Sequence, residues 1–235
     1  MKKILLFGGF GFIGTNLLKF IDEYYHDEYV VVVFDRFLKH PHGLSFKCIQ
    51  KVYAGDFADS LLIREIFQQD KFDYVFHFLS STVPSTSFNT SFDVESNVIP
   101  TLRMLDLMIE FNVKNIVYLS SGGAIYGNSE NHIKHKESDN AFPLSSYGVV
   151  KLTIEKYLCQ YQYTNKINPL ILRLSNPYGK YHYSMKQGII NIALKSAIQG
   201  EIVKVWGDGN TKKDYIFIDD QHPAKKRELG THIGN

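Results

Sequence analysis

Three side chains that could carry proton transfer lie near one another in the sequence: a serine, a tyrosine and a lysine. Residues 119–127 read LSSGGAIYG, in which Ser120 and Ser121 supply hydroxyl groups directly before a pair of glycines. The later stretch SSYGVVK places Tyr147 and Lys151 at i and i+4, a spacing that puts both on one face of a helix. A lysine ammonium beside a phenol lowers the pKa of the phenol, so that a tyrosinate can act as a base near neutral pH. We therefore predict that Ser121, Tyr147 and Lys151 are catalytic residues.

The position of this pair says more than its spacing does. The chain has fifteen tyrosines, so about one tyrosine–lysine pair at i,i+4 is expected by chance. Tyr147, however, follows a predicted strand at 115–119 whose end bears the two serines. In an open α/β sheet, ligands bind outside the carboxyl ends of the strands. Residues 79–81 and Asn176 also fall at predicted strand ends, so they are expected at the same edge.

Short apolar runs alternate with segments of helical periodicity over most of the chain. The strands read as continuous apolar stretches, which is typical of a parallel sheet covered by helices on both faces. We therefore predict an α/β fold with a doubly wound parallel sheet. Pro100 is the only interruption expected within the predicted helix at 94–111. Strands are predicted at 3–7, 29–34, 48–53, 73–79, 115–119 and 169–174, and helices at 12–25, 61–68, 94–111 and 146–163.

The pattern changes after Leu174, which predicts a second, smaller lobe. A helix over 188–199 and short strands at 201–205 and 214–218 are expected there. The last residues, QHPAKKRELGTHIGN, are polar and charged and have no apolar helical stripe. The predicted organisation is a nucleotide-binding domain over 1–174, a partial substrate-binding lobe over 175–220 and an atypical tail over 221–235.

A glycine-rich turn joins the first predicted strand to the first helix. It runs Gly8-Gly9-Phe10-Gly11-Phe12-Ile13-Gly14. Glycines allow a tight turn and let a pyrophosphate reach the N-terminus of the helix, where free N–H groups favour anions. An ordinary tight turn is the alternative interpretation.

Asp35, which ends the second strand 21 residues after Gly14, adds weight to the nucleotide interpretation. A carboxylate there can accept hydrogen bonds from a ribose and would repel a 2′-phosphate, so NAD is favoured over NADP. Arg36 weakens that preference without reversing it. Asp56, in YAGDF, is placed to reach the adenine, or else is an ordinary loop aspartate.

Composition excludes several other classes of protein. With 235 residues, 44% hydrophobic and 21% charged, the chain is expected to be globular. The sequence contains no run of 18 apolar residues, so no membrane span is expected. The net charge of +2, with scattered lysines, does not indicate a nucleic-acid partner. The nine histidines lack metal-site spacing, so no metal is expected. Two cysteines without motif spacing favour a reducing, cytoplasmic location.

Together these segments resemble the extended short-chain dehydrogenase/reductase family. Within that family, the likeness is to nucleotide-sugar epimerases of the UDP-glucose 4-epimerase type. The matching segments follow the family order over residues 1–220. They are FGGFGFIG, Asp35, AGDF, VFHFLS, Asn97 in ESNV, LSSGGAIYG, SSYGVVK, RLSNPYG and WGDGNTKKDYIFIDD.

The resemblance implies a Rossmann-type sheet and a specific reaction. NAD would stay bound while the sugar is oxidised at C4 to a 4-keto intermediate and reduced again on the other face. Tyr147 would take the proton from the 4-hydroxyl group. Asn176 and Lys213 would contact the nucleotide-sugar phosphates, with Lys213 standing where the family usually has an arginine. The implied NAD-binding residues are Gly8, Gly11, Phe12, Ile13, Asp35, Asp56, Phe57, Phe78, Leu79, Ser80, Asn97, Ser120, Tyr147, Lys151 and Ser175.

The resemblance also implies what surrounds the reaction. Such enzymes serve polysaccharide biosynthesis or galactose metabolism, and the helices at 94–111 and 146–163 would form a homodimer seam. Relatives usually continue well past the length of this chain, so a C-terminal truncation is expected. A nucleotide-sugar reductase that consumes NAD(P)H, and a truncated NAD-binding protein without activity, remain as alternatives.

Gly122 departs from the family pattern. The family usually carries a serine or threonine there, and its hydroxyl group binds the reacting oxygen. Ser121, one residue earlier, or a water molecule is expected to replace it. Members that dehydrate sugars carry an acidic pair just after that hydroxyl, where this chain has Gly123 and Ala124. We therefore expect the chain not to be a 4,6-dehydratase.

Overall fold

The structure, a computed structural model, describes residues 1–127, 134–184, 187–203, 209 and 212–221. The chain divides into two compact units, Met1–Ser175 and Asn176–Asn235. The first unit holds a six-stranded sheet, and the described residues of the second include a two-stranded sheet and the helix α7 (Ile189–Gln199). Each unit is described below by itself.

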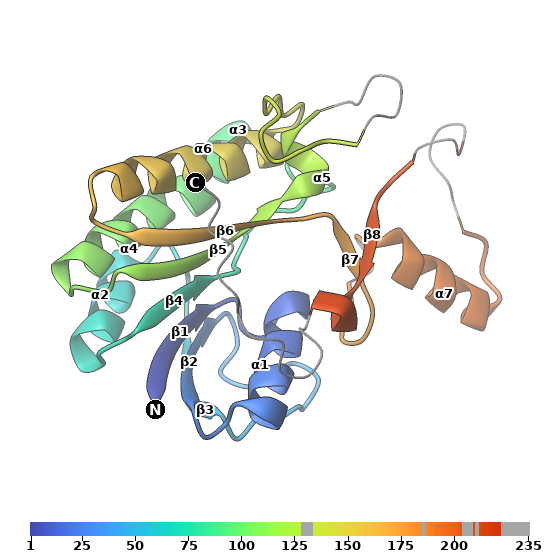
Figure 1. Cartoon of the computed structure of the whole chain (residues 1–235). Helices are drawn as coiled ribbons and strands as arrows, with labels where there is room; N and C mark the ends of the chain where they lie inside the picture. Colours follow the sequence, from blue (N-terminus) through green and yellow to red (C-terminus); the bar gives the residue numbers. More distant parts are fainter. Residues whose placement is uncertain (128–133, 185–186, 204–208, 210–211, 222–235) are drawn as a thin grey trace. The chain divides into compact units, whose positions relative to one another are not determined.

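All six strands of the first unit run parallel, in the order β3-β2-β1-β4-β5-β6 (Figure 1). This is the strand order of a Rossmann fold, in which the chain starts at the centre and winds outward to each edge in turn. The predicted α/β fold with a doubly wound parallel sheet is therefore confirmed. The strands are β1 (Lys2–Phe7), β2 (Tyr29–Asp35), β3 (Ile49–Ala54), β4 (Tyr74–His77), β5 (Asn115–Ser121) and β6 (Asn168–Leu174).

The central strand β1 supplies side chains to two separate cores. Leu5 and Phe7 belong to the larger cluster, which is packed by three helices, whereas Ile4 and Leu6 belong to the cluster packed by one helix. Successive side chains of a strand point to opposite faces, so an uninterrupted apolar run is what a doubly covered strand requires. The larger core is covered by α2 (Ser60–Gln69), α4 (Ile99–Glu110) and α6 (Ser146–Tyr163), and the smaller core by α1 (Phe12–Tyr24) (Figure 1).

Polar side chains fix where two of these helices begin. Asp59 precedes α2 and accepts hydrogen bonds from the backbone N–H groups of Leu61 and Leu62, both at 3.1 Å. Ser145 precedes α6 and accepts one from the N–H group of Gly148 at 3.2 Å. An N-cap of this kind satisfies donors that have no partner within the helix. The cap on α6 places Tyr147 in the first turn of its helix.

The helix predicted over 94–111 is more irregular than expected. A short helix α3 (Thr90–Asp93) leads into a π-helical turn, η1 (Val94–Val98), and α4 follows with Pro100 in its first turn. Proline has no N–H group, and its ring clashes with the carbonyl four residues earlier inside an α-helix. The wider π-helical turn lies directly before the proline. The irregularity therefore precedes Pro100 and includes Asn97, which is a correction to the prediction.

Two further details differ near the carboxyl edge of the sheet. Strand β4 ends at His77 rather than at residue 79, so residues 78–81 form a loop. A four-residue helix, α5 (Gly122–Ile125), follows β5 directly and was not predicted. Both changes place irregular backbone at the edge where the candidate catalytic residues lie.

The second unit contains a parallel strand pair and one long helix. Strand β7 (Asn176–Tyr178), which was not predicted, pairs with β8 (Tyr215–Phe217). The helix predicted over 188–199 is confirmed as α7 (Ile189–Gln199), and a 3₁₀ turn, η3 (Ile218–Gln221), follows β8. Residues 201–203 form no strand, and residues 204–205 of that prediction lie outside the described residues, as does the predicted tail beyond residue 221.

The described helices were also compared with what a bilayer requires. Among them, none is both long enough and apolar enough to cross a membrane.

Candidate active site

Most glycines of the β1–α1 turn are required by the fold itself. Gly8 has a φ of +80°, and a Cβ on it would lie 2.9 Å from the backbone nitrogen of Leu79. A Cβ on Gly14 would lie 2.3 Å from the carbonyl oxygen of Gly8. Any side chain at either position would push α1 or the loop after β4 away from the turn, so these two glycines bring the helix and that loop close to the end of β1.

Gly11 is different, because the fold does not require a glycine there. Its φ is −72°, and a Cβ would meet only the Gly8 carbonyl oxygen, at 3.4 Å. Gly11 is the N-cap of α1, which has no side-chain cap, and Phe12 and Ile13 form the start of the helix. An uncapped helix N-terminus behind a residue without a side chain fits the close approach of a pyrophosphate.

Asp35 lies beside this turn at the end of β2. Its Oδ2 accepts a hydrogen bond from the N–H group of Phe10 at 2.9 Å, and its Oδ1 accepts one from the N–H group of Arg36 at 2.7 Å. These bonds hold the carboxylate at the rim of the glycine turn. A carboxylate offers about four acceptor positions, so it retains capacity for ribose hydroxyl groups. The turn and Asp35 together fit the adenosine end of NAD.

Asp56 and Phe57, which follow β3, present different groups. Asp56 is exposed, and its Oδ1 accepts from the N–H group of Ala58 at 2.9 Å. The Phe57 ring is buried against those of Phe7 and His77, with centroids 5.2 and 5.1 Å away. Only the backbone of Phe57 is therefore suited to contact a cofactor.

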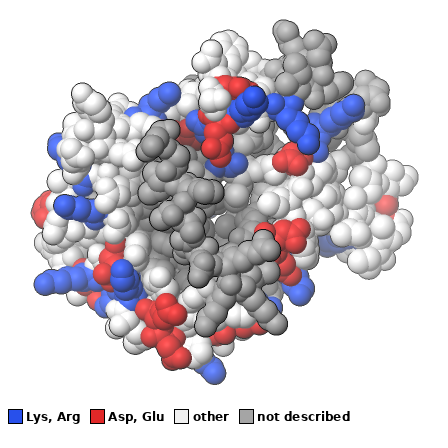
Figure 2. Space-filling model, in the orientation of Figure 1, with Lys and Arg blue, Asp and Glu red and all other residues white. Residues whose placement is uncertain are grey.

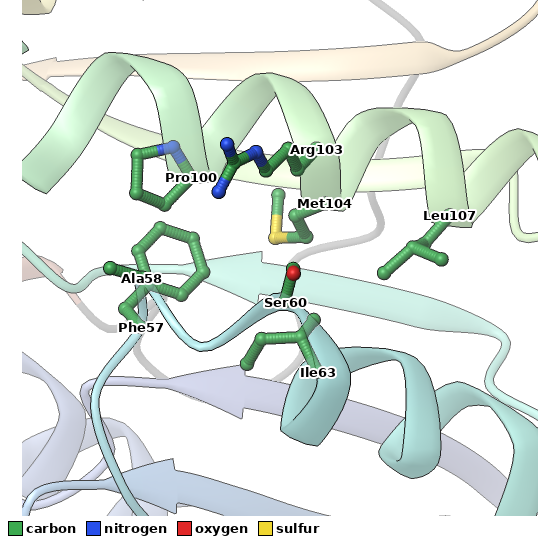
Figure 3. A pocket seen from close by; sticks show the side chains of 8 residues that line it. All are labelled: Phe57, Ala58, Ser60, Ile63, Pro100, Arg103, Met104 and Leu107. Atoms are coloured by element: carbon green, nitrogen blue, oxygen red, sulfur yellow. The ribbon is translucent and has the colours of Figure 1, made fainter. Parts of the chain in front are cut away.

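A small pocket also borders Phe57, between α2 and α4 (Figure 3). Its walls are mostly apolar, with the Ser60 hydroxyl group and the Arg103 guanidinium as polar exceptions. None of the predicted catalytic residues lines it. The pocket belongs to the helix layer and shares only Phe57 with the candidate cofactor-binding residues.

Asn97 braces the loop that follows β4. Its Oδ1 accepts a hydrogen bond from the N–H group of Ser81 at 2.8 Å, while its Nδ2 donates to the Asp93 carbonyl oxygen at 3.0 Å. The Ser80 hydroxyl group donates to the Thr82 carbonyl oxygen at 2.7 Å. The adjacent loop residues Phe78 and Leu79 are half-buried. Asn97, which lies in the π-helical turn η1, therefore holds the loop after β4 in place. π-helical turns are frequent at functional sites.

The structure brings α6 to the end of β5, where the Ser121 side chain lies beside the Tyr147 phenol. Burial raises the pKa of the Tyr147 phenol to about 12, and the hydrogen bond from Ser121 opposes that rise. The expected pKa below the ordinary value of a phenol is therefore wrong, because burial outweighs the effect of the neighbouring groups. Desolvation disfavours the phenolate more strongly than the neighbouring groups favour it.

Lys151 is almost fully buried, at 4% exposure. Its Nζ donates to the Leu119 carbonyl oxygen at 2.9 Å and lies 5.7 Å from the centroid of the Tyr147 ring. Burial lowers the pKa of this ammonium to about 8, while the charge of Glu155 raises it. Lys151 is thus held in place beside the phenol with a pKa near physiological pH.

The space around Gly122 explains the missing hydroxyl group. A Cβ there would lie 2.9 Å from the carbonyl oxygen of Arg173 and 3.3 Å from that of Leu174. The end of β5 therefore approaches the backbone of β6 too closely for a side chain. Ser121 supplies the hydroxyl group at Tyr147, while the Ser120 Oγ is buried without a hydrogen-bond partner among the described atoms.

Asp93 is a site neighbour that the sequence did not reveal. It is fully buried, and its Oδ2 accepts hydrogen bonds from the hydroxyl groups of Ser87 and Ser146, the latter at 2.5 Å. Ser146 directly precedes Tyr147, so Asp93 ties the start of α6 to the loop after β4. The available signal was weak: a carboxylate four residues before Asn97, in a segment that also contains the acidic Glu95.

The two predicted substrate residues occur in the second unit. The Asn176 side chain donates to the Asp214 carbonyl oxygen at 2.8 Å, and its backbone N–H group donates to the same oxygen at 3.2 Å. Lys213 directly precedes Asp214, so the β7–β8 pairing brings Asn176 and Lys213 close together. Ser175 ends the first unit, between β6 and β7.

Charge and metal chemistry give no competing site in the described part of the chain. No group of three or more histidine, cysteine or acidic side chains there could hold a metal ion. On the face shown in Figure 2, basic and acidic side chains are interspersed instead of forming one basic patch.

Comparison with known proteins identifies the family of this chain. The family model described as "NAD dependent epimerase/dehydratase family" matches residues 4–224. A UDP-glucose 4-epimerase of Halalkalibacterium halodurans is 33% identical over 257 residues, covering 99% of this chain and 75% of that protein. A dTDP-D-glucose 4,6-dehydratase of Dictyostelium discoideum is 27% identical over 250 residues, covering 98% of this chain and 57% of that protein.

A solved structure shows the same fold. The crystal structure of UDP-glucose 4-epimerase with UDP-glucose from Thermotoga maritima superposes with a TM-score of 0.84 at 29% sequence identity. The match covers 93% of this chain and 70% of that one. The chain therefore spans between 57 and 75% of the length of these three proteins.

Proposed function

Because the chain belongs to the NAD-dependent epimerase/dehydratase family, with NAD as the family's cofactor, we propose that it epimerises a nucleotide sugar at C4 through a 4-keto intermediate. The substrate is of the UDP-glucose/UDP-galactose type. One arrangement carries this proposal: Ser121 ends β5 beside the Tyr147 phenol, and the buried Lys151 ammonium lies 5.7 Å from the centroid of the Tyr147 ring.

Each of the three side chains has a role that its geometry supports. Tyr147 accepts the proton of the sugar 4-hydroxyl group, and returns it when the ketone is reduced on the opposite face. Ser121 is placed to hydrogen-bond the same oxygen, because its side chain lies beside the phenol. The Lys151 ammonium is a positive charge near the ring that favours the phenolate. NAD, when bound, supplies the hydride acceptor and then the hydride donor.

The residues that would hold NAD lie at the carboxyl edge of the sheet. Gly11 and the start of α1 would receive the pyrophosphate, and Asp35 would bind the adenosine ribose. The carboxylate of Asp35 favours NAD over NADP, because a 2′-phosphate would bring a second negative charge beside it. The loop after β4 and Asn97 would line the other half of the cofactor site.

The absence of acidic side chains in α5 favours epimerisation over dehydration. Removing water across C5 and C6 of a sugar requires an acid and a base besides the tyrosine, and this family's dehydratases place them just after the hydroxyl-bearing residue. Here Gly123 and Ala124 occupy those positions, within α5, and neither can transfer a proton. This chain would therefore share the oxidation step with the dehydratases of the family. It lacks the groups that elimination needs.

The second unit would hold the nucleotide. Asn176 and Lys213 lie together at the β7–β8 pair, where an amide and an ammonium can bind phosphate oxygens. Lysine contributes one point charge and lacks the two-pronged donor of arginine. Substrate affinity should therefore depend on ionic strength.

A homodimer through α4 and α6 completes the proposal. Tyr161 of α6 donates to Asp106 of α4 at 2.8 Å, so the two helices form one continuous surface. Tyr157 and Tyr163 of α6 are 42 and 88% exposed, and Val149 is also exposed. Exposed aromatic and apolar side chains on adjacent helices are typical of an interface. We place the protein in the cytoplasm, in the supply of sugars for polysaccharides.

The test is conversion of UDP-glucose to UDP-galactose by the purified chain, compared with its Tyr147→Phe variant. The variant should bind NAD normally and lose at least about 100-fold in turnover, because it removes the proton acceptor. Tyr24→Phe, the same change at an exposed position of α1, is the matched control and should retain full turnover. Net consumption of NAD(P)H would indicate a reductase instead. Undiminished turnover in Tyr147→Phe would refute the proposed role.

A further inference from the structure

The face of α6 that carries Tyr147 and Lys151 continues to a third ionisable side chain. Glu155 follows Lys151 at i+4, so the three residues form one row along the helix. Glu155 is only 3% exposed. A carboxylate at that depth must be paired or lose its charge, and the proposed chemistry gives it no role.

The partner of Glu155 is Arg173 on β6. The Arg173 Nε donates to both carboxylate oxygens at 3.1 Å, and its Nη2 donates to Oε2 at 2.6 Å. This two-pronged geometry is the strongest form of an arginine–carboxylate pair. It fixes the carboxylate one helical turn from the Lys151 ammonium.

Arg173 also holds the segment that follows the catalytic serine. Its Nη1 donates to the Tyr126 hydroxyl group at 2.7 Å and to the Glu137 carbonyl oxygen at 3.2 Å. The Tyr126 ring stacks on His135 with centroids 4.9 Å apart. One guanidinium thus joins α6, β6 and the end of α5.

We propose that Glu155 and Arg173 are positioning residues that keep Lys151 charged and in place beside Tyr147. This proposal deepens the function proposed above and rests on it for the meaning of the Lys151 charge. Its test, however, needs neither substrate nor turnover.

The other groups around Lys151 do not supply a negative charge. From β4 it faces His77, whose pKa is lowered to about 3 by burial and by the Lys151 charge itself. From β5 and α6 it faces the neutral phenols of Tyr118 and Tyr147. The carboxylate of Asp93, on α3, is engaged by two serine hydroxyl groups near the start of α6.

Glu155 is therefore the anion that can stabilise the buried ammonium, and its charge raises the pKa of Lys151 against the effect of burial. Arg173 limits this effect, because its own positive charge lies beyond the carboxylate and partly offsets it. The pair together holds the lysine near the midpoint of its titration at physiological pH.

Removing the charge of Glu155 has an effect whose sign is diagnostic. Glu155→Gln keeps the shape of the side chain but leaves Arg173 as an unbalanced cation near Lys151. The pKa of Lys151 should then fall by about one pH unit, an order of magnitude set by charges one helical turn apart inside a protein. A purely structural role predicts the opposite, because a loosened site admits water and lets the pKa rise toward 10.5.

The measurement is the titration of Lys151 by NMR in the full chain labelled with ¹³C at lysine Cε. The Lys151 signal is assigned by its absence in Lys151→Met. Arg64 and Glu110 form a similar two-pronged pair on the outer surface of α2 and α4, with contacts of 2.5 and 2.8 Å. Glu110→Gln is therefore the matched control, and should leave the Lys151 titration unchanged.

A second variant is needed if Glu155→Gln fails to fold, which would show as the loss of a cooperative unfolding transition. In Glu155→Leu/Arg173→Met no charge is left buried without a partner, a kind of replacement that folded proteins often tolerate. The Lys151 pKa should again fall, because the nearer of the two charges was the attractive one. An unchanged or higher Lys151 pKa in the cooperatively folded variant would overturn the proposal.

Discussion

Restoring a hydroxyl group at position 122 should harm this protein. The family usually carries serine or threonine there, so Gly122→Ser looks like a repair. In the structure, however, a Cβ at Gly122 would lie 2.9 Å from one backbone carbonyl oxygen of β6 and 3.3 Å from the next. Backbone atoms cannot rotate away as the end of a side chain can. Either β5 or β6 must move for any side chain to fit.

The expected size of the effect follows from this geometry. Forcing one extra group into a packed site typically costs about 1 to 3 kcal/mol of unfolding free energy. For a chain of this length, each kcal/mol lowers the midpoint of thermal unfolding by roughly 2 to 4 °C. The movement would also displace Ser121 and the carbonyl oxygen of Arg173, so turnover should fall as well. Gly122→Ala should cost nearly as much stability, because the Cβ and not the hydroxyl group causes the clash.

Urea unfolding followed by circular dichroism, together with the epimerase assay, tests this reasoning. Comparing Gly122→Ala with Gly122→Ser separates the added carbon from the added hydroxyl group. If both variants are as stable as the parent chain, the close approach of β5 and β6 is wrong. If Gly122→Ser is also more active, then Ser121 is not the catalytic hydroxyl group.

Four further outcomes follow from the same structure. His77 has a pKa lowered to about 3 by burial, so its contribution to stability is complete above about pH 6.5 and is lost as the pH falls toward 3. In His77→Leu, the free energy of unfolding measured with urea should therefore change less steeply with pH in that window, by up to about 1.4 kcal/mol per pH unit. An unchanged slope would contradict a buried, neutral His77 ring. Tyr118→Phe removes a buried hydroxyl group without a partner and should raise the unfolding free energy by about 1 kcal/mol. Tyr161→Phe, which loses its bond to Asp106, should instead lower it by a similar amount, and equal effects of the two changes would refute both assignments. Tyr157→Glu should shift sedimentation from dimer to monomer, and an unchanged profile would exclude the α4–α6 surface as the interface.

The nucleotide-binding half of the chain could be predicted because its signals are local. The apolar runs of β1 and β2 are long enough to mark buried parallel strands. The glycines between β1 and α1 show in the sequence that the backbone must turn tightly. Asp35 could be identified because it is the polar residue at which the apolar run of the second strand ends. None of these inferences depends on knowing which segments meet in space.

The parts that could not be predicted depend on tertiary contacts. Pro100 was expected to interrupt a helix, but the π-helical turn around Asn97 forms one turn earlier, where the loop after β4 needs a partner. Arg173 and Glu155 are 18 residues apart and meet only because β6 and α6 are neighbours. Likewise, the spacing of Tyr147 and Lys151 predicted a lowered tyrosine pKa. Burial, which spacing does not report, outweighs that effect.

Tracing the hydrogen at C4 of the substrate tests the central proposal most directly. UDP-glucose deuterated at C4 is incubated with the purified chain and NAD in ordinary water, and the product is examined by NMR. Transfer of hydride away from C4 and back again predicts UDP-galactose that retains the deuterium at C4, with no net NADH formed. Product that has exchanged this deuterium for solvent hydrogen would contradict the proposed mechanism. So would the absence of any UDP-galactose from a chain whose unfolding midpoint NAD demonstrably raises.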